Sequence, residues 1–283
     1  MIVAIRNDAS LRGKIRAIAK REGLRPQEVL QMFLFEHLLL RLEKTSYVDK
    51  FILKGGLLIS SMIGVSLRTT MDMETTVVGM PLDRDSIEQT MEQICSVDVG
   101  DGMEYIFERV ESIRTDDEYP NWRAHIMVRY GRMNAPIKVD ITTGDSIVPA
   151  EVEYPYPMLF EDRAIRLMSY PVATILAEKF ETVVSRGVAN TRGRDFYDIY
   201  VFLNTRGDQI EYGQVKRALE ATARKRGTSA FVADYRSRLE KVRLSDDMLA
   251  VWESYVRSAP YASDISFDDV VSAAVRLGNL VSA

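Results

Sequence analysis

The sequence contains very little cysteine or histidine. Its 283 residues include one cysteine, Cys95, and two histidines, His37 and His125. A single cysteine cannot form a disulfide within the chain, and with two distant histidines a zinc site of the His/Cys type is close to excluded. Any metal in this protein would therefore have to be held by carboxylates, which suits magnesium or manganese.

Long apolar runs are also missing. No stretch approaches the ~20 uninterrupted apolar residues of a membrane span. The first residues, MIVAIRNDASLRGK, contain too few apolar residues for a signal peptide. We therefore expect a cytoplasmic protein with no membrane partner. The length allows one large domain or two ordinary ones, with ample core in either case.

The net charge of −4 argues by itself against a nucleic-acid partner, but the charges are unevenly distributed. Residues 1–54 hold 11 Lys/Arg against 6 Asp/Glu, a local +5, and residues 224–243 hold 7 against 2, another +5. Residues 55–223 hold 17 against 27, a local −10. Two basic segments around an acidic middle could form a phosphate-binding groove at a metal centre, although solvated helix faces explain the counts as well. The candidate RNA contacts in the second basic segment are Arg224, Lys225 and Arg226.

Hydrophobic periodicity predicts helices, then mixed strands with a helix, then helices again. Predicted helices cover residues 9–22, 26–43, 57–64, 83–97, 171–187 and 193–207, with mostly helical patterns after 209. Predicted strands cover residues 51–54, 67–79, 103–115, 122–131 and 135–145, with loops at 116–121 and 151–160. This order predicts an α+β chain with a mostly antiparallel or mixed sheet. His37 lies inside the second helix, where a structural role is expected.

Two carboxylates stand one residue apart in LRTTMDMETTVVG, which reads as a strand. Since side chains two apart on a strand point to the same face, Asp72 and Glu74 project together. A later strand, IKVDIT, places Asp140 on one face with Lys138 and Thr142. If these strands are neighbours, three carboxylates converge and repel each other unless a divalent cation neutralises them. The pattern predicts a metal site and a substrate that bridges the metal, usually a phosphate.

A double glycine precedes this acid pair. The segment Lys54-Gly55-Gly56 ends a short apolar run, and a buried-looking helix follows it. Helix N-termini present free N–H groups to anions, and glycine lets a phosphate approach closely. We therefore expect Lys54, Gly55 and Gly56 to bind substrate phosphate. Arg68 is a further candidate contact, or an ion-pair partner of a nearby acid.

Four ordered motifs resemble the AbiEii group, the toxin components of type IV toxin–antitoxin systems within the polymerase-β type of nucleotidyltransferases. FILKGGLLIS with LRTTMDME is similar to its first motif, IKVDI to its second, and LAEKFETVVSRG and TRGRDFYDIYVF to the remaining two. The resemblance spans most of residues 10–230. It implies a nucleotidyltransferase-type mixed sheet with flanking helices, N-terminal helices and a helical C-terminal half. We expect residues 1–160 to hold the N-terminal helices and the core, and residues 161–283 to form a helical domain that contributes to the active site.

By this resemblance, Asp72 and Glu74 would hold Mg²⁺ (or Mn²⁺), and Asp140 would be the third acid, near the attacking hydroxyl. The chain departs from the group's pattern at one place, because the group usually has aspartate where Glu74 stands. The extra methylene moves the carboxylate oxygens, and octahedral magnesium tolerates such a move poorly. Weakened activity, an altered metal preference or an introduced change would each fit.

The same resemblance makes Lys179 a contact for nucleotide phosphates, and Asp195 or Asp198 would complete the site. Arg186 lies two turns further along the helix that carries Lys179, so both can reach one anion. Alternatives from the residues alone stay open. Lys179 could be a solvated lysine paired with a glutamate of its own helix, and Asp195 could cap the next helix. Asp198 lies inside that helix, where aspartate is a poor helix former.

The resemblance implies a metal-dependent nucleotidyltransferase toxin. It would transfer a nucleoside monophosphate from a nucleoside triphosphate to RNA, specifically the 3′ end of tRNA, and a cognate antitoxin would neutralise it. One alternative is nucleotide transfer to a protein or a small molecule. Another is a non-catalytic nucleotide- or RNA-binding protein whose metal site is degraded at Glu74.

Overall fold

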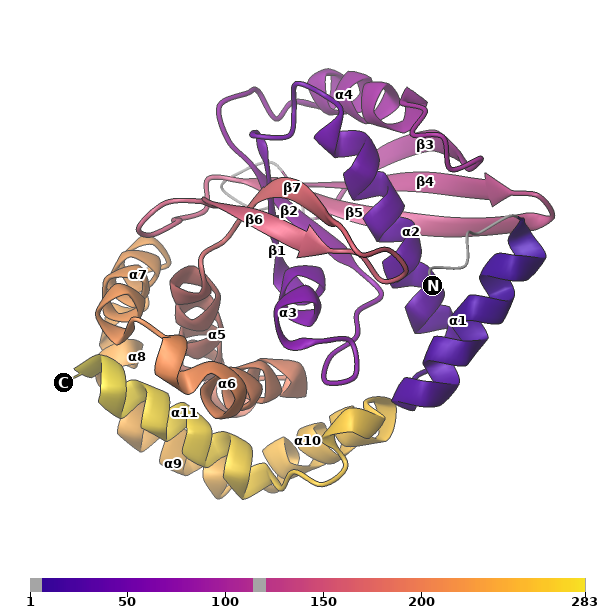
Figure 1. Ribbon diagram of the computed structural model, residues 1–283. Helices are drawn as coiled ribbons and strands as arrows, with labels where there is room; N and C mark the ends of the chain where they lie inside the picture. Colours follow the sequence, from indigo (N-terminus) through magenta and orange to yellow (C-terminus); the bar gives the residue numbers. More distant parts are fainter. Residues whose placement is uncertain (1–6, 114–120, 283) are drawn as a thin grey trace. The chain divides into compact units, whose positions relative to one another are not determined.

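The structure, a computed structural model, describes residues 7–113 and 121–282 (Figure 1). The predicted loop at 116–121 therefore lies almost wholly outside the described residues. By packing, the chain divides into two compact units. The sheet unit comprises Met1–Asp145 with Val152–Ser169, and the helical unit comprises Ser146–Glu151 with Tyr170–Ala283.

A seven-stranded sheet is the centre of the sheet unit, with the strand order β3-β4-β5-β2-β1-β7-β6. The neighbours β1/β7 and β2/β5 are parallel and the other pairs are antiparallel, so the sheet is mixed as predicted. The strands are β1 (Phe51–Lys54), β2 (Met73–Val77), β3 (Glu104–Ser112), β4 (Trp122–Tyr130), β5 (Met133–Thr143), β6 (Val152–Pro157) and β7 (Ala164–Ser169). Alternation along β4 and β5 buries one face of the sheet and leaves the other polar.

Helices cover both faces of this sheet. Figure 1 shows α2 and α4 on one face and α3 on the other. Asn7 and Asp83 cap α1 and α4 by accepting from the N–H groups of Ser10 and Ser86, and Pro26 is the first residue of α2. The helices are α1 (Asp8–Glu22), α2 (Pro26–Glu43), α3 (Gly55–Ile63) and α4 (Arg84–Ser96).

A buried polar network fixes α2 to the loop before β3. Arg41 donates to both carboxylate oxygens of Asp101, at 2.7 and 2.9 Å, and to the carbonyl of Met103 at 2.8 Å. Its guanidinium lies 4.0 Å from the centroid of the Tyr105 ring. The ring nitrogen Nδ1 of His37 lies 2.8 Å from the same carboxylate. His37 therefore has the structural role that its place in the helix predicted.

The predicted loop at 151–160 is wrong, because most of it forms β6, which pairs with β7 over its whole length. The prolines Pro155 and Pro157 argued against a strand, since proline cannot donate to a ladder. Strand β6 is at the edge of the sheet, where one side of the strand needs no donor, and proline is tolerated there.

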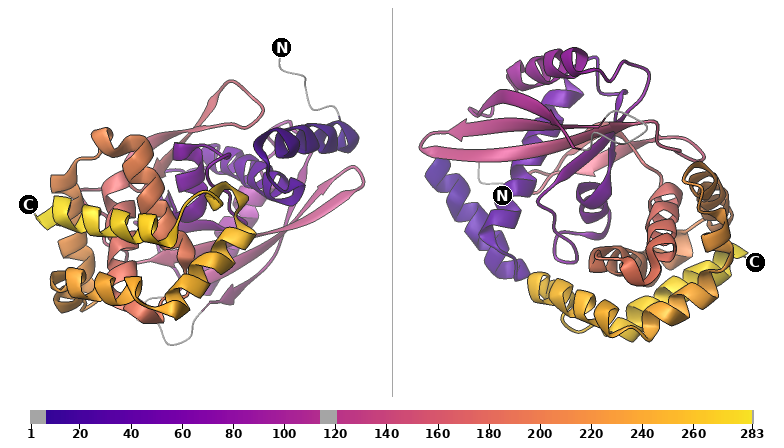
Figure 2. Two further views of the ribbon diagram at one scale, coloured as in Figure 1. Left: turned by 90° about the horizontal axis from the view of Figure 1, so that it is seen from below. Right: turned by 180° about the vertical axis from the view of Figure 1, so that it is seen from behind.

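The helical unit packs its helices around α5 and α6. Phe180, Phe196 and Phe202 are fully buried in it, and α11 packs against both α6 and α9 (Figure 2). The hydroxyl of Thr174 bonds with both the N–H and the carbonyl of Val148, which ties residues 146–151 to the start of α5. Its helices are α5 (Val172–Arg186), α6 (Gly193–Arg206), α7 (Tyr212–Lys225), α8 (Ser229–Ala233), α9 (Tyr235–Arg243), α10 (Asp246–Ser258) and α11 (Phe267–Ser282), with short 3₁₀ turns at Gly187–Ala189, Gly207–Gln209 and Pro260–Ala262. None of the described helices of either unit is both long and apolar enough to cross a membrane.

Candidate active site

The double glycine starts α3 and makes room for the acid-bearing segment. Gly55 has φ +69°, a conformation that other residues rarely adopt. A Cβ there would lie 1.9 Å from Oε2 of Glu74, and a Cβ at Gly56 would lie 2.8 Å from Oγ1 of Thr70. The glycines are therefore required by the packing of residues 70–74. The approach of a substrate phosphate to the same turn stays a prediction.

One row of charged side chains crosses five strands on the polar face of the sheet. Strand register places Glu111 of β3 opposite Arg123 of β4, Arg123 opposite Asp140 of β5, Asp140 opposite Glu74 of β2, and Glu74 opposite Lys54 of β1. We call these five residues the charged row. Its signs run −, +, −, −, +, so each carboxylate of the central pair has a cation on its outer side.

The two cations of the charged row have different partners. Arg123 donates from Nε and Nη2 to the two oxygens of Asp140, at 2.7 and 2.8 Å. These bonds raise the pKa of the Arg123 guanidinium, and the charges of Asp140 and Asp72 raise it further, against the effect of burial. On the other side, Lys54 donates to the hydroxyl of Thr142 at 2.7 Å and to the carboxylate of Asp145.

The strand predicted over residues 67–79 is shorter in the structure, and Asp72 lies one residue before the start of β2. Its N–H donates to the hydroxyl of Thr70, and the same hydroxyl donates to its carbonyl. In the described parts of the chain, no three His, Cys, Asp or Glu side chains are grouped closely enough to hold a metal as they stand. The structure thus brings Glu74 and Asp140 together by register, and the predicted convergence of all three acids stays a prediction.

Arg68 is almost completely buried, with 4% of its surface exposed. Its guanidinium donates to the carbonyl of Thr69, and a Cβ on Gly56 would lie 3.3 Å from it. These contacts place Arg68 against the start of α3. They give it a packing role beside the double glycine, and its proposed contact with substrate is untested.

A second charged cluster lies inside the helical unit. Nζ of Lys179, on α5, lies 2.6 Å from Oδ1 of Asp195 and 2.9 Å from Oδ2 of Asp198, both on α6. The aspartates are 3% and 0% exposed, so one lysine compensates two buried carboxylates. The alternative that Asp195 caps α6 is wrong, because Arg192 is the N-cap residue. Lys179 is therefore paired across to the neighbouring helix, and a pairing with a glutamate of its own helix stays an open alternative.

The glutamates of α5 have another partner. Arg226 forms ion pairs with Glu178, at 3.2 Å, and with Glu181. Arg186, Arg224, Lys225 and Arg226 are all exposed, so the basic end of α7 faces solvent.

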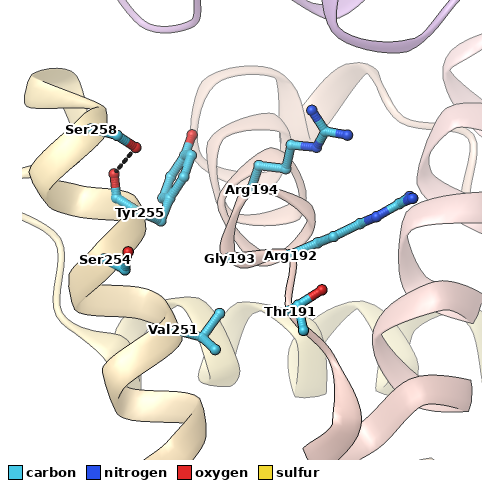
Figure 3. Close-up of a pocket in the computed structure, with 8 residues that line it drawn as sticks. All are labelled: Thr191, Arg192, Gly193, Arg194, Val251, Ser254, Tyr255 and Ser258. Atoms are coloured by element: carbon cyan, nitrogen blue, oxygen red, sulfur yellow. Dashed lines mark hydrogen bonds between the residues drawn. The ribbon is translucent and has the colours of Figure 1, made fainter.

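A surface cavity of about 360 Å³ opens between the start of α6 and α10. Its lining residues are Thr191, Arg192, Gly193, Arg194, Val251, Ser254, Tyr255 and Ser258. Figure 3 shows Tyr255 on one helix and Arg194 on the neighbouring element, with the Arg194 guanidinium pointing away from the Tyr255 ring. The start of α6 lies very close to α10 here, since a Cβ on Gly193 would lie 2.8 Å from the Cβ of Tyr255. An arginine, an aromatic ring and a helix start together suit a phosphate carrying a base.

The sequence did not identify Arg123 and Asp145 as site residues. Arg123 lies in a predicted strand with regular alternation, and nothing in that alternation distinguishes it from the other outward-facing residues. Asp145 follows a glycine in a predicted turn. Both matter because of tertiary contacts: strand register brings Arg123 to Asp140, and Lys54 forms an ion pair with Asp145 beyond the end of β5. No short motif contains that information.

Residues 37–273 match the protein family described as nucleotidyl transferase AbiEii toxin, type IV TA system. The fold is similar to the crystal structure of a candidate nucleotidyltransferase from H. pylori, with a TM-score of 0.54 and 15% identity over 92% of this chain and 95% of that one. It is also similar to JHP933 from Helicobacter pylori, with a TM-score of 0.52 and 14% identity over 92% of each chain. No curated protein matches the chain.

Proposed function

Because the chain belongs to the AbiEii nucleotidyltransferase toxin family of type IV toxin–antitoxin systems, we propose that it transfers a nucleoside monophosphate from a nucleoside triphosphate to RNA. The acceptor that we propose is the 3′ end of tRNA, and the proposed protein partner is a cognate antitoxin. One observation carries the proposal: Glu74 and Asp140 stand opposite each other on adjacent parallel strands, beside the glycine turn that starts α3.

The residues of this site fit a magnesium or manganese ion. Magnesium is usually held by one or two carboxylates, with waters and substrate phosphates completing its shell. Glu74 and Asp140 would supply the two carboxylates, and Asp72, which lies within the electrostatic reach of Arg123 beside them, is the candidate for a third. When bound, the ion would neutralise the triphosphate and help to orient the attacking hydroxyl.

The chain's own groups have separate roles in the proposed reaction. The acceptor hydroxyl oxygen bonds to the α-phosphorus, the bond from that phosphorus to the β-phosphate bridge breaks, and pyrophosphate leaves. Asp140 accepts the hydroxyl proton. The free N–H groups at the start of α3 face the anionic substrate. Lys179 is the proposed contact for the triphosphate, and it would have to share its charge with Asp195 and Asp198.

Glu74 allows a direct test of the metal geometry. Its carboxylate reaches over Gly55, so the shorter side chain of Glu74→Asp would withdraw from the glycine turn. If the long arm is a handicap, the transfer rate of Glu74→Asp exceeds that of the parent protein. Equal rates would show that the site accommodates the longer arm and that the argument from magnesium geometry is wrong.

An RNA acceptor is supported by two surfaces of the helical unit. The end of α7 exposes Arg224 and Lys225, and the cavity at the start of α6 is lined by Arg194 and Tyr255. Cationic side chains bind the backbone of any RNA, and tyrosine stacks on any base. These surfaces fit single-stranded RNA ends better than they fit a protein side chain.

The deciding experiment supplies each labelled nucleoside triphosphate with magnesium and either total RNA or total protein. Label in the RNA fraction supports the proposal, and label in the protein fraction supports transfer to protein. Asp140→Asn is the matched inactive control, since it removes a charge without removing volume. Nucleotide binding without any transfer would support the non-catalytic alternative, which the ion pair between Arg123 and Asp140 also suits.

A further inference from the structure

We propose that Arg123 is the resident counter-ion of Asp140 and that it must release Asp140 before a divalent cation can bind there. This makes Arg123 a positioning residue that sets the metal affinity of the site. The inference rests on the proposed function, because it takes Asp140 as a metal ligand.

The geometry of the pair carries this inference. Arg123 and Asp140 are register partners on β4 and β5, and two parallel hydrogen bonds of 2.7 and 2.8 Å join them. The planar guanidinium thereby engages both carboxylate oxygens at once, the strongest arrangement that arginine makes with a carboxylate. Those two oxygens are the atoms that magnesium or manganese would need. Two cations on one carboxylate repel each other, so the ion and the guanidinium compete.

The bond between Arg123 and Asp140 is strong enough to compete with a metal ion, and it is exposed enough to break when the ion binds. Its side chain is 32% exposed and that of Asp140 is 21% exposed, so water can screen and replace the bond. A fully buried pair could not open at a comparable cost. Exchange of Arg123 for a metal ion is therefore within reach of ordinary binding energies.

A receiving group lies on the other side of the arginine. Glu111 is the register partner of Arg123 on β3, and its side chain is 47% exposed. Glu111 already contacts His125, through Oε1 at 2.9 Å, and it retains a second carboxylate oxygen that lies 3.7 Å from Arg109. A small rotation of the Arg123 side chain across the strand would move its charge from Asp140 to Glu111. The charged row thus contains both the present partner of the guanidinium, Asp140, and the carboxylate that would receive it, Glu111.

The test measures Mn²⁺ binding directly, by the loss of the electron paramagnetic resonance signal of the free ion, and it needs no turnover. Arg123→Gln is expected to bind Mn²⁺ roughly three- to tenfold tighter than the parent protein. Arg123→Lys keeps the charge but loses the two-pronged bond, so its affinity is expected between the two. Thermal melting without metal checks that each variant folds, and Arg123→Lys stays informative if Arg123→Gln does not.

Lys138→Gln is the matched control. Lys138 lies two residues before Asp140, on the same face of β5, and is exposed. The Lys138→Gln variant removes one positive charge, as Arg123→Gln does, but leaves the bond between Arg123 and Asp140 intact. Less than a twofold change is expected for it. Equal gains in Lys138→Gln and Arg123→Gln would reduce the effect to general electrostatics and overturn the proposal, as would weaker binding by Arg123→Gln.

The inference and the proposed function fail in different ways. Asp140→Asn should abolish the Mn²⁺ binding that Arg123→Gln strengthens. If the parent protein transfers nucleotide but Arg123→Gln and Arg123→Lys leave Mn²⁺ affinity unchanged, the inference fails and the function stands. If neither the parent protein nor Arg123→Gln binds Mn²⁺, the inference fails together with the metal-dependent part of the proposed function.

Discussion

Replacing Glu36 with glutamine should change how the stability of the protein depends on pH. Glu36 lies on α2 with none of its surface exposed. Its Oε2 accepts from the N–H of Leu159 at 2.8 Å, and Oε1 has no hydrogen-bond partner among the described residues. Burial raises the pKa of Glu36 from 4.5 to about 8, an effect that the bond from Leu159 opposes. At neutral pH the folded protein therefore holds a proton on this carboxyl.

The sign and size of the effect follow from that proton. Between pH 4.5 and about 8 the folded chain binds a proton that the unfolded chain has lost, so the free energy of unfolding decreases as pH rises. Each pH unit contributes about 1.4 kcal/mol, and the shift of about 3.5 units (8 − 4.5) gives a total of about 5 kcal/mol. Stability from this group is fully present below pH 4.5 and is lost above pH 8. Glu36→Gln imitates the protonated form and removes the dependence.

The assay compares urea unfolding of the two proteins from pH 5 to pH 9.5. The difference between them cancels every other titrating group. We expect near-equal stability at pH 5 and a clear advantage for Glu36→Gln at pH 9. Glu161→Gln, an exposed change of the same chemistry close to Glu36, is the control; because burial is the main cause of the raised pKa of Glu36, this variant should keep most of the pH dependence of the parent protein. A difference that does not vary with pH would refute the assignment of a buried, protonated Glu36.

Three further changes follow from the site. Gly55→Ala should lower the free energy of unfolding by about 1–3 kcal/mol, measured by urea unfolding, because φ is +69° and the new methyl group displaces Glu74; unchanged stability would contradict the packing role of the glycine. Lys179→Ala removes a cation that contacts two buried carboxylates, so a lower melting temperature by several degrees is expected, and full stability with weakened nucleotide binding would instead show a purely functional lysine. Alanine at both Arg224 and Lys225 should weaken RNA binding across sequences and flatten its salt dependence, and an unchanged slope in a titration would mean that they only face solvent.

The elements of this fold could be predicted well where the local pattern decides them. Pro26 begins α2, Asp83 caps α4 and Gly187 follows the end of α5, as their residue types indicated. Strand β6 was missed because its prolines are acceptable only at a sheet edge, and edge position is a property of the whole sheet. The alternative that Asp195 caps α6 was also wrong, because its partner Lys179 is on another helix and only tertiary packing brings the two together.

In the candidate site, too, local sequence patterns predicted some features, and strand register determined the others. The spacing of Asp72 and Glu74 was visible in the sequence, and so was the face on which Asp140 projects. Their neighbours were not visible, because register between β4 and β5 is set by pairing along two whole strands. Arg123 therefore carried no signal of its own, although it makes the closest contact with Asp140.

Charge compensation explains how the sheet can carry an acid pair before any ion arrives. Glu74 and Asp140 are adjacent on parallel strands, where side chains on one face are close enough to repel. Arg123 beyond Asp140 and Lys54 beyond Glu74 supply one positive charge on each side. The ion pair with Arg123 thus reduces the repulsion between the two carboxylates in the folded chain before an ion binds. The same positive charge opposes the binding of a metal ion, because an ion that binds Asp140 must displace the guanidinium of Arg123.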